Sequence, residues 1–308
     1  MNKKQHTLKK AIHFSGVSLH SGVFSKVSIE PAPENSGICF QRVDLPNSPV
    51  FKASVDLVTD LRRSTSIQFK DAIIGTTEHC LAALYAMQVD NALIKINAEE
   101  MPILDGSAKY FTDAIMEAGL ETQNALRSFY KIEKTIEYHD EEKGVALKIT
   151  PSNSFQLEVT IDFNSKNFKP QSASLNAIED FQAEIAVCKT FCFLHEVETL
   201  IKSGLIKGAN LDNAIVYVDR EVNQKDLEKV ADFLNIEEVK VTKNTYLGNT
   251  DLLFENEPAR HKLLDVIGDL ALLGKPILGK LTAYRPGHAS NIAFAKKIKK
   301  NTNPIIIT

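Results

Sequence analysis

Alternating apolar positions predict strands over most of the first hundred residues. Turn-forming clusters such as PAPENSG and DLPNSP separate these segments. The expected strands span residues 27–31, 37–43, 64–69 and 92–97. Residues 77–87 change to helical spacing, with Thr77 as the expected N-cap. A second, short helix is expected over 109–118, where Gly119 would end it.

The second half of the chain repeats this order of strands followed by a helix. A composition break at 121–128 separates the halves, and the expected strands after it span 130–138, 144–150, 156–163 and 280–284. A helix is expected over 258–273, with Pro258 in its first turn. Each half therefore has a helix with a histidine near its start, His79 or His261. The pattern predicts an α+β fold of two similar domains, 1–124 and 125–308, each a strand-rich layer packed with helices.

Composition and charge narrow the class of protein. The chain has 308 residues, of which 44% are hydrophobic and 24% charged, which excludes disordered and collagen-like chains. With 36 Lys and Arg against 39 Asp and Glu, a nucleic-acid partner is not expected. The most apolar long segment, 263–284, is interrupted by charged residues, and the basic N-terminus is followed by no apolar signal core. We therefore expect a cytoplasmic protein.

Two of the four cysteines have a spacing that invites two interpretations. Cys188 and Cys192 are four residues apart, so a helix would place both on one face with metal-ligand spacing. Plain buried thiols are the favoured interpretation.

A polar stripe stands out in the segment RHKLLDVIGD. His261, Asp265 and Asp269 recur every four residues, so a helix stacks all three along one face. Such a stripe is either solvated or built for a chemical task. The motif alone does not decide between these two.

A second cluster, Glu78-His79, favours a chemical role for this polar stripe over a solvated one. Together with His261 and Asp265, His79 would complete a His–His–Asp set with one open position, which is typical of a catalytic zinc site. Glu78 would then act as the general base toward water. Other first-row metals accept two histidines and a carboxylate, so zinc is favoured and not fixed.

A hydrolase also needs an acid for its leaving group and a stabiliser for the oxyanion. His288, expected in a loop beside Gly287, is the candidate acid, and Asp269 could orient it and raise its pKa. Lys262 is either an anion-binding group or a solvated lysine.

The segment KTFCFL offers a hydroxyl and two aromatic rings. Thr190 could join the oxyanion site, and Phe191 and Phe193 could stack on a sugar or a base. Packing as alternate residues of a strand is the favoured interpretation of the two rings.

The chain resembles the UDP-3-O-acyl-N-acetylglucosamine deacetylase family, the zinc amidohydrolases of lipid A biosynthesis. The resemblance covers essentially all 308 residues. It rests on GVSLHSG, TTEHCLAAL, DNALIKINAEEMPILDGSA, KTFCFL, LDNAIV, RHKLLDVIGDLALLG and LTAYRPGHASN.

The resemblance implies one zinc ion per chain and a UDP-linked acylated amino sugar as substrate. It implies hydrolysis of UDP-3-O-(3-hydroxyacyl)-N-acetylglucosamine to the free 2-amine and acetate, at the committed step of lipopolysaccharide synthesis. It also implies a site between two domains and an apolar acyl passage formed by an insert in the second domain, part of which matches 203–213. The implied roles are zinc ligation by His79, His261 and Asp265, general base for Glu78, acid for His288 oriented by Asp269, substrate and oxyanion contacts for Lys262 and Thr190, and substrate contacts for Phe191, Phe193 and His20.

Some features depart from the family or leave alternatives. Residues 219–251 form a longer stretch than the family leads us to expect, and the chain has no room for the dehydratase to which some relatives are fused. The basic run 296–300 is a solvated face or a weak peripheral contact with the inner membrane.

The alternatives to the deacetylase are a non-catalytic sugar-nucleotide or lipid-binding protein and a metallohydrolase for another acetamido sugar. The absence of HExxH argues against the commonest zinc peptidases.

Overall fold

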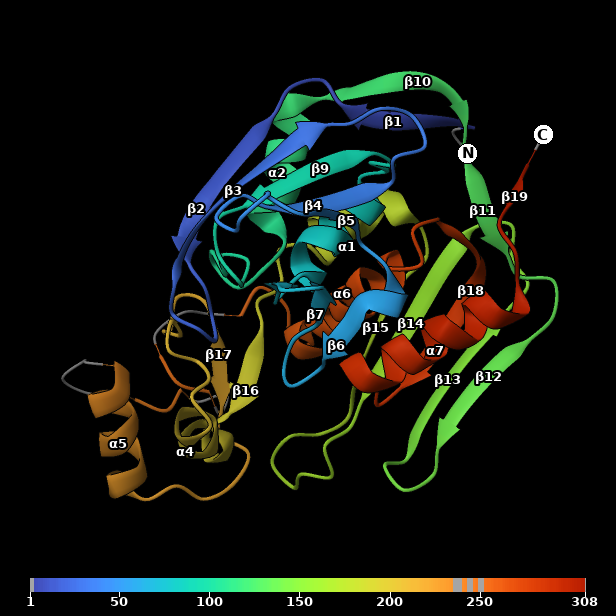
Figure 1. The fold of residues 1–308 in the computed structure, drawn as a ribbon. Helices are drawn as coiled ribbons and strands as arrows, with labels where there is room; N and C mark the ends of the chain where they lie inside the picture. The colour runs from blue at the N-terminus through green and yellow to red at the C-terminus, as the bar shows by residue number, and fades with distance from the viewer. Residues whose placement is uncertain (1–2, 235–239, 243–245, 249–251, 308) are drawn as a thin grey trace.

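A five-stranded sheet forms the outer layer of the N-terminal half. The computed structural model describes residues 3–234, 240–242, 246–248 and 252–307. The sheet has the order β2–β3–β9–β4–β5, in which β4 and β9 are parallel. These strands span Ile12–Val17, Phe24–Pro31, Ala92–Ile96, Ile38–Arg42 and Val50–Lys52. Figure 1 shows helix α1 (Glu78–Ala86) beneath this sheet, and α2 (Lys109–Ala118) packs against α1 and β2.

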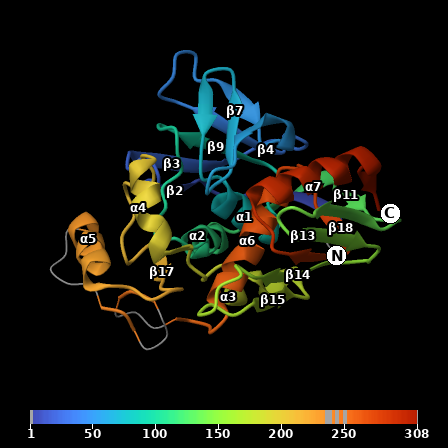
Figure 2. The same cartoon turned by 90° about the horizontal axis from the view of Figure 1, so that it is seen from below.

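A seven-stranded mixed sheet forms the opposite outer layer. β18 (Ile277–Tyr284) is its central strand and pairs with β11, β13 and β14. The other strands are β11 (Ser128–Lys131), β12 (Ile136–Asp140), β13 (Val145–Thr150), β14 (Phe155–Ile161), β15 (Gln171–Leu175) and β19 (Ile305–Ile306). Helices α6 (Glu257–Ala271) and α7 (His288–Asn301) pack side by side on this sheet, and α6 also packs against α1 (Figure 2). The layers thus run sheet, helices, helices, sheet.

Smaller elements surround these layers. β1 (Lys4–Leu8) pairs with β10 (Leu120–Leu126), and β6 (Val58–Asp60), β7 (Ser66–Phe69) and β8 (Ala72–Ile74) form a third sheet. β16 (Phe191–Phe193) runs parallel to β17 (Ile215–Tyr217). The remaining helices are α3 (Phe181–Glu184), α4 (Leu194–Lys202), α5 (Gln224–Leu234) and the 3-10 turns η1 (Val55–Leu57) and η2 (Ile178–Asp180).

The segment from β16 to α5 has an apolar core of its own. The buried residues of this core within the segment are Leu194, Val197, Leu200, Ile206, Val216, Val218, Val230 and Ala231, and Leu247 joins them from farther along the chain. Because this cluster is separate from the main core, the segment forms a lobe of its own. We call residues 191–234 the side lobe; it lies beside the layered body in Figure 1.

The expected α+β class is confirmed, and most expected elements are present. The expected strand 130–138 is instead two strands, because β11 ends at Lys131 and β12 begins at Ile136 in a different pairing. The predicted boundary segment 121–128 contains most of β10, which returns to pair with β1. The division at 124 and 125 stays a prediction.

The structure corrects one local expectation and refines two others. His288 was expected in a loop, but it is the first residue of α7, where the Gly287 N–H donates to Ser290 Oγ over 3.0 Å. Cys188 and Cys192 share no helix, since Cys192 lies in β16 and Cys188 follows α3. Both are free thiols; Cys188 is buried, as favoured, and Cys192 is half-buried. Thr77 takes the N-cap position of α1, but its side chain makes no capping hydrogen bond.

No helix in the described part of the chain combines the length and apolar character of a membrane span. The segment 263–284 is divided between the greater part of α6 and the whole of β18.

Candidate active site

A buried group of three donor side chains lies where α1 meets α6. His79 is the second residue of α1, and His261 and Asp265 lie one turn apart on α6. Asp265 Oδ1 is 3.4 Å from His261 Nε2 and 3.9 Å from His79 Nε2. One ligand atom from each residue lies within 4.8 Å of the others, and this is the one such group of three among the described residues.

These distances and donor types suit a metal ion. Two ligand atoms on a tetrahedral zinc, each about 2.0–2.1 Å from the ion, lie about 3.4 Å apart. His79, His261 and Asp265 therefore need little movement to share one ion, and a fourth position is left open.

A glycine on α6 permits this approach. A Cβ on Gly268 would lie 2.1 Å from the carbonyl oxygen of Glu78, so only a residue without a side chain fits between the two helices. As a result the rings of His79 and His261 meet edge to face, with centroids 5.0 Å apart and planes at 87°.

The polar stripe of α6 is buried, which overturns the solvated interpretation. His261, Asp265 and Asp269 are 1%, 3% and 0% exposed. His261 Nδ1 lies 3.0 Å from the Cys188 carbonyl oxygen and donates its hydrogen there, which turns Nε2 toward the cluster. Lys262 Nζ donates to Asp265 Oδ2 over 2.7 Å and leaves Oδ1 facing the two histidines.

The electrostatic surroundings favour the ligand form of each side chain. Burial, reinforced by the neighbouring His261, lowers the pKa of His79 to about 3, and burial also lowers the pKa of His261. Burial opposes ionisation of Asp265, but the Lys262 ammonium and the nearby imidazoles outweigh it and lower the pKa of that carboxyl. Neutral imidazoles and an ionised carboxylate are the forms that bind a metal.

Glu78 is a buried carboxyl beside this cluster. Its Oε2 accepts the backbone N–H of Thr65 over 3.0 Å. Burial raises the pKa of Glu78 to about 7; His288 opposes this shift, and Asp265 and Asp269 add to it. A carboxylate with such a pKa can accept a proton at neutral pH.

His288 and Asp269 form the second titratable pair. His288 Nδ1 is 2.9 Å from Asp269 Oδ2. Burial lowers the pKa of His288, but the charge of Asp269 and the hydrogen bond that His288 Nδ1 donates to it outweigh burial and raise the pKa to about 9. Asn291 Nδ2 also donates to Asp269 Oδ2 over 2.8 Å. The structure thus brings His288 and Asp269 together as expected.

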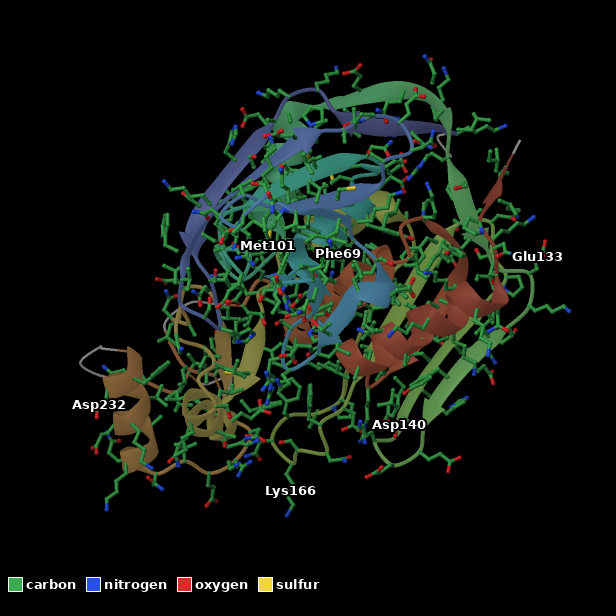
Figure 3. The ribbon with its side chains drawn as sticks, viewed as in Figure 1. Phe69, Met101, Glu133, Asp140, Lys166 and Asp232 are labelled. Carbon is green, nitrogen blue, oxygen red and sulfur yellow. The ribbon has the colours of Figure 1, made fainter. Side chains whose placement is uncertain are left out.

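The wall of one cavity of about 440 Å³ includes Glu78, His79, His261, Lys262, Asp265 and His288, but not Asp269. Ligand sites in proteins commonly have about 300–1,000 Å³. Part of the wall is apolar and comes from the side lobe: Val197, Leu200, Ile206, Ala209, Leu211, Ala214, Val216, Val230 and Phe233. Polar and charged residues line another part, among them Asp140 at the end of β12, labelled in Figure 3.

The remaining predicted residues also line the cavity. Thr190 is held by its own N–H, which donates to the Gly106 carbonyl over 2.8 Å. Lys262 Nζ lies 5.7 Å from the ring centroid of Phe191. Phe193 is 4% exposed and packs 4.9 Å from the Phe163 ring, in agreement with packing in a strand.

His20 lies between β2 and β3 and also reaches the cavity wall. Its backbone N–H donates to Glu100 Oε1 over 2.9 Å. Neither ring nitrogen has a hydrogen-bond partner among the described residues. His20 is thus a cavity-wall residue whose buried ring nitrogens are unsatisfied among the described residues.

Three residues at the site were not predicted: Thr65, Asn291 and Glu100. Thr65 and Asn291 contact Asp269, and Glu100 accepts hydrogen bonds from His20 and from the Thr76 hydroxyl. No spacing in the sequence marks them, because each acts across long sequence separations.

Comparison with known proteins gives one consistent family. A family model described as "LpxC: UDP-3-O-acyl N-acetylglycosamine deacetylase" matches residues 5–235 and 234–300. A protein named UDP-3-O-acyl-N-acetylglucosamine deacetylase from Anaeromyxobacter sp. is 39% identical over 296 residues, which are 96% of this chain and 88% of that protein. One of the same name from Neisseria meningitidis is 38% identical over 300 residues, covering 96% of this chain and 89% of that protein.

A longer relative is also similar. The "Bifunctional enzyme LpxC/FabZ" of Bacteroides thetaiotaomicron is 43% identical over 297 residues. The match covers 96% of this chain but 64% of the bifunctional relative. Since the family model and these relatives match along nearly the whole chain, it belongs to the UDP-3-O-acyl N-acetylglycosamine deacetylase family.

Proposed function

We propose that this chain hydrolyses the N-acetyl group of UDP-3-O-(3-hydroxyacyl)-N-acetylglucosamine, giving acetate and the free 2-amine, in lipid A biosynthesis. One observation carries the proposal. A single cavity has the cluster of His79, His261 and Asp265 on one part of its wall and the apolar residues of the side lobe on another. An acylated acetamido sugar needs both a polar reaction centre and an apolar place for its chain. Family membership and the names of the relatives agree with this substrate.

We assign His79, His261 and Asp265 as ligands of one zinc ion. When bound, such an ion polarises a carbonyl oxygen and lowers the pKa of water to about 7. The choice of zinc rests on the donor set, two imidazoles and one carboxylate with an open fourth position.

The chain's own residues supply the proton transfers. Glu78 accepts a proton from the water whose oxygen forms a bond with the acetamide carbon. The carbonyl electrons move onto oxygen, where the Lys262 ammonium and the Thr190 hydroxyl stabilise the negative charge. His288, protonated below about pH 9, donates its Nε2 proton to the sugar nitrogen as the C–N bond breaks.

The other cavity residues bind the substrate. Phe191, Phe193 and His20 are proposed contacts for the sugar and nucleotide, since all three line the cavity. The apolar wall of the side lobe would receive the acyl chain, because burying each methylene stabilises binding by about 0.8 kcal/mol.

We place the reaction in the cytoplasm, with at most peripheral contact with the inner membrane. All four cysteines are free, which fits a reducing compartment. The proposed partner is the nucleotide-linked substrate, with no nucleic acid.

Acetate release from this substrate tests the proposal. Chelator-treated protein is expected to be inactive, and activity should return with about one zinc per chain. A folded, zinc-loaded protein that binds the substrate without turnover would instead identify a binding protein of the same fold. Release of acetate only from another acetamido sugar would change the substrate.

A further inference from the structure

Thr65 is a fully buried residue that touches both halves of the proposed proton-transfer machinery. It lies between β6 and β7 and is 0% exposed. Its backbone and its hydroxyl contact different partners, one on α1 and the others on α6 and α7.

The backbone of Thr65 holds the start of α1. Its N–H donates to Glu78 Oε2 over 3.0 Å. Its carbonyl oxygen accepts the N–H of Thr77 over 3.2 Å and the Thr77 hydroxyl over 3.0 Å. These contacts fix the Glu78 carboxylate and explain why the Thr77 hydroxyl does not cap the helix.

The hydroxyl of Thr65 contacts the second pair. Oγ1 donates to Asp269 Oδ1 and lies 3.1 Å from His288 Nδ1. A hydroxyl has one hydrogen to donate and lone pairs that accept. Since its hydrogen goes to the carboxylate, a lone pair can face the imidazole N–H. Asp269 Oδ2 is taken by His288 and Asn291, so the hydroxyl of Thr65 satisfies the other oxygen.

We propose that Thr65 is a positioning residue that fixes the Glu78 carboxylate and the Asp269–His288 pair relative to one another. The proposal rests on the proposed function for the roles of Glu78 and His288. With Nδ1 of His288 engaged by Asp269 and Thr65, Nε2 is the nitrogen left for the substrate. Without the hydroxyl, the Asp269 carboxylate and the His288 ring can rotate together. His288 Nε2 is then no longer held in the orientation that proton donation to the substrate requires.

A pair of variants isolates the hydroxyl. Thr65→Val keeps the shape and the backbone N–H to Glu78 but loses the hydroxyl, and Thr65→Ser keeps the hydroxyl. Thr112→Val is the matched control, because Thr112 is also 0% exposed and donates to a backbone carbonyl, that of Lys109, in α2. We expect kcat to fall about 10- to 100-fold in Thr65→Val with little change in KM, since partners that orient reacting groups contribute at this level. Thr65→Ser should recover most of kcat, and Thr112→Val should match the wild type.

A second measurement does not depend on turnover. The hydrogen on His288 Nδ1, shielded from water in its hydrogen bond, should give a downfield proton resonance in the wild type, in Thr65→Ser and in Thr112→Val. In Thr65→Val it should be lost through exchange. If Thr65→Val does not fold, Thr65→Ala provides the same comparison.

The outcomes separate this proposal from the proposed function. A wild type that releases no acetate refutes the function, and the resonance then decides the role of Thr65 by itself. The positioning role is overturned when Thr65→Val keeps the resonance and the wild-type kcat. It is also overturned when Thr65→Ser loses as much kcat as Thr65→Val, because the methyl group and not the hydroxyl would then matter.

Discussion

Gly268 lies at the contact between α1 and α6, and replacing it with alanine tests whether this contact sets the geometry of the site. A Cβ at this position would lie 2.1 Å from the carbonyl oxygen of Glu78 and 2.7 Å from its carbonyl carbon. Ordinary contacts of a Cβ begin at 3.4 Å, so α1 and α6 must separate by about 1.3 Å. The movement would carry Glu78 and His79 away from His261 and Asp265.

The effects on stability and on activity should differ in size. Alanine favours a helix over glycine by about 1 kcal/mol, whereas overpacking costs about 1–3 kcal/mol. Because these terms partly cancel, the free energy of unfolding should fall by at most about 2 kcal/mol. Catalysis has no such compensation, and a displacement of about 1 Å can cost about 100-fold in rate.

The assay compares kcat, zinc affinity and Tm for Gly268→Ala and for a control. Zinc affinity can be measured by competition with a chromophoric chelator, and it should fall together with kcat. Gly16→Ala is the control, because a Cβ there would meet Pro102 at an ordinary 3.5 Å. Wild-type kcat and zinc affinity in Gly268→Ala, with an unchanged or higher Tm, would refute the reasoning.

Four further predictions concern the proposed site. Asp269→Asn removes the charge that keeps the pKa of His288 at about 9 against the effect of burial. The alkaline limb of the pH–rate profile should therefore move to lower pH. An unmoved limb would exclude His288 as the acid. In the wild type the same pair stabilises the fold fully below the unfolded pKa of about 6.5, and this contribution should be lost as pH rises through about 9, as urea titrations at several pH values would show. Glu78→Ala should lose most of kcat while it retains zinc, whereas His261→Ala should lose zinc itself. Metal analysis of both variants checks this prediction. Stoichiometric, tightly bound zinc in His261→Ala would remove that residue from the ligand set. Ala209→Phe should fill the part of the cavity beside the apolar wall. If two methylenes of about 0.8 kcal/mol each lose their binding place, kcat/KM for a long-chain substrate should fall about tenfold, with no effect on a short-chain analogue. An equal loss for both substrates would show that the acyl chain binds elsewhere.

Periodicity identified the elements whose apolar side chains face the core. The helix expected over 258–273 and the strand over 92–97 are nearly as predicted, because each has a buried face read directly from its apolar spacing. β1 was not predicted, since Gln5, His6 and Thr7 are buried polar residues with hydrogen-bond partners, and such residues leave no apolar pattern.

Two other elements were hidden for different reasons. β10 is mostly exposed, so its polar residues were interpreted as the boundary between two domains and not as a strand. α7 has Ile292, Ala295 and Ile298 at helical spacing on its buried side, but Gly287 before it was interpreted as part of a loop. A glycine is also an acceptable N-cap, and that is its position here.

The site was predictable only where its residues lie close together in the sequence. The spacing of His261, Asp265 and Asp269 indicated one face of a helix, but it could not show that the face is buried. That His79 would meet His261 was a chemical hypothesis, since nothing local joins residues so far apart. The contacts of Thr65 with Asp269 and His288 span 204 and 223 positions, and no single-sequence pattern reaches across such distances.

The distribution of the three donors over the chain has a thermodynamic consequence. One donor comes from α1 and two come from α6, so an unfolded chain offers no comparable site. An ion that binds only the native chain shifts the folding equilibrium by mass action, by about 4 kcal/mol at a thousand times its dissociation constant. The concentration of the free ion would therefore affect the folded fraction of the protein as well as its catalytic rate.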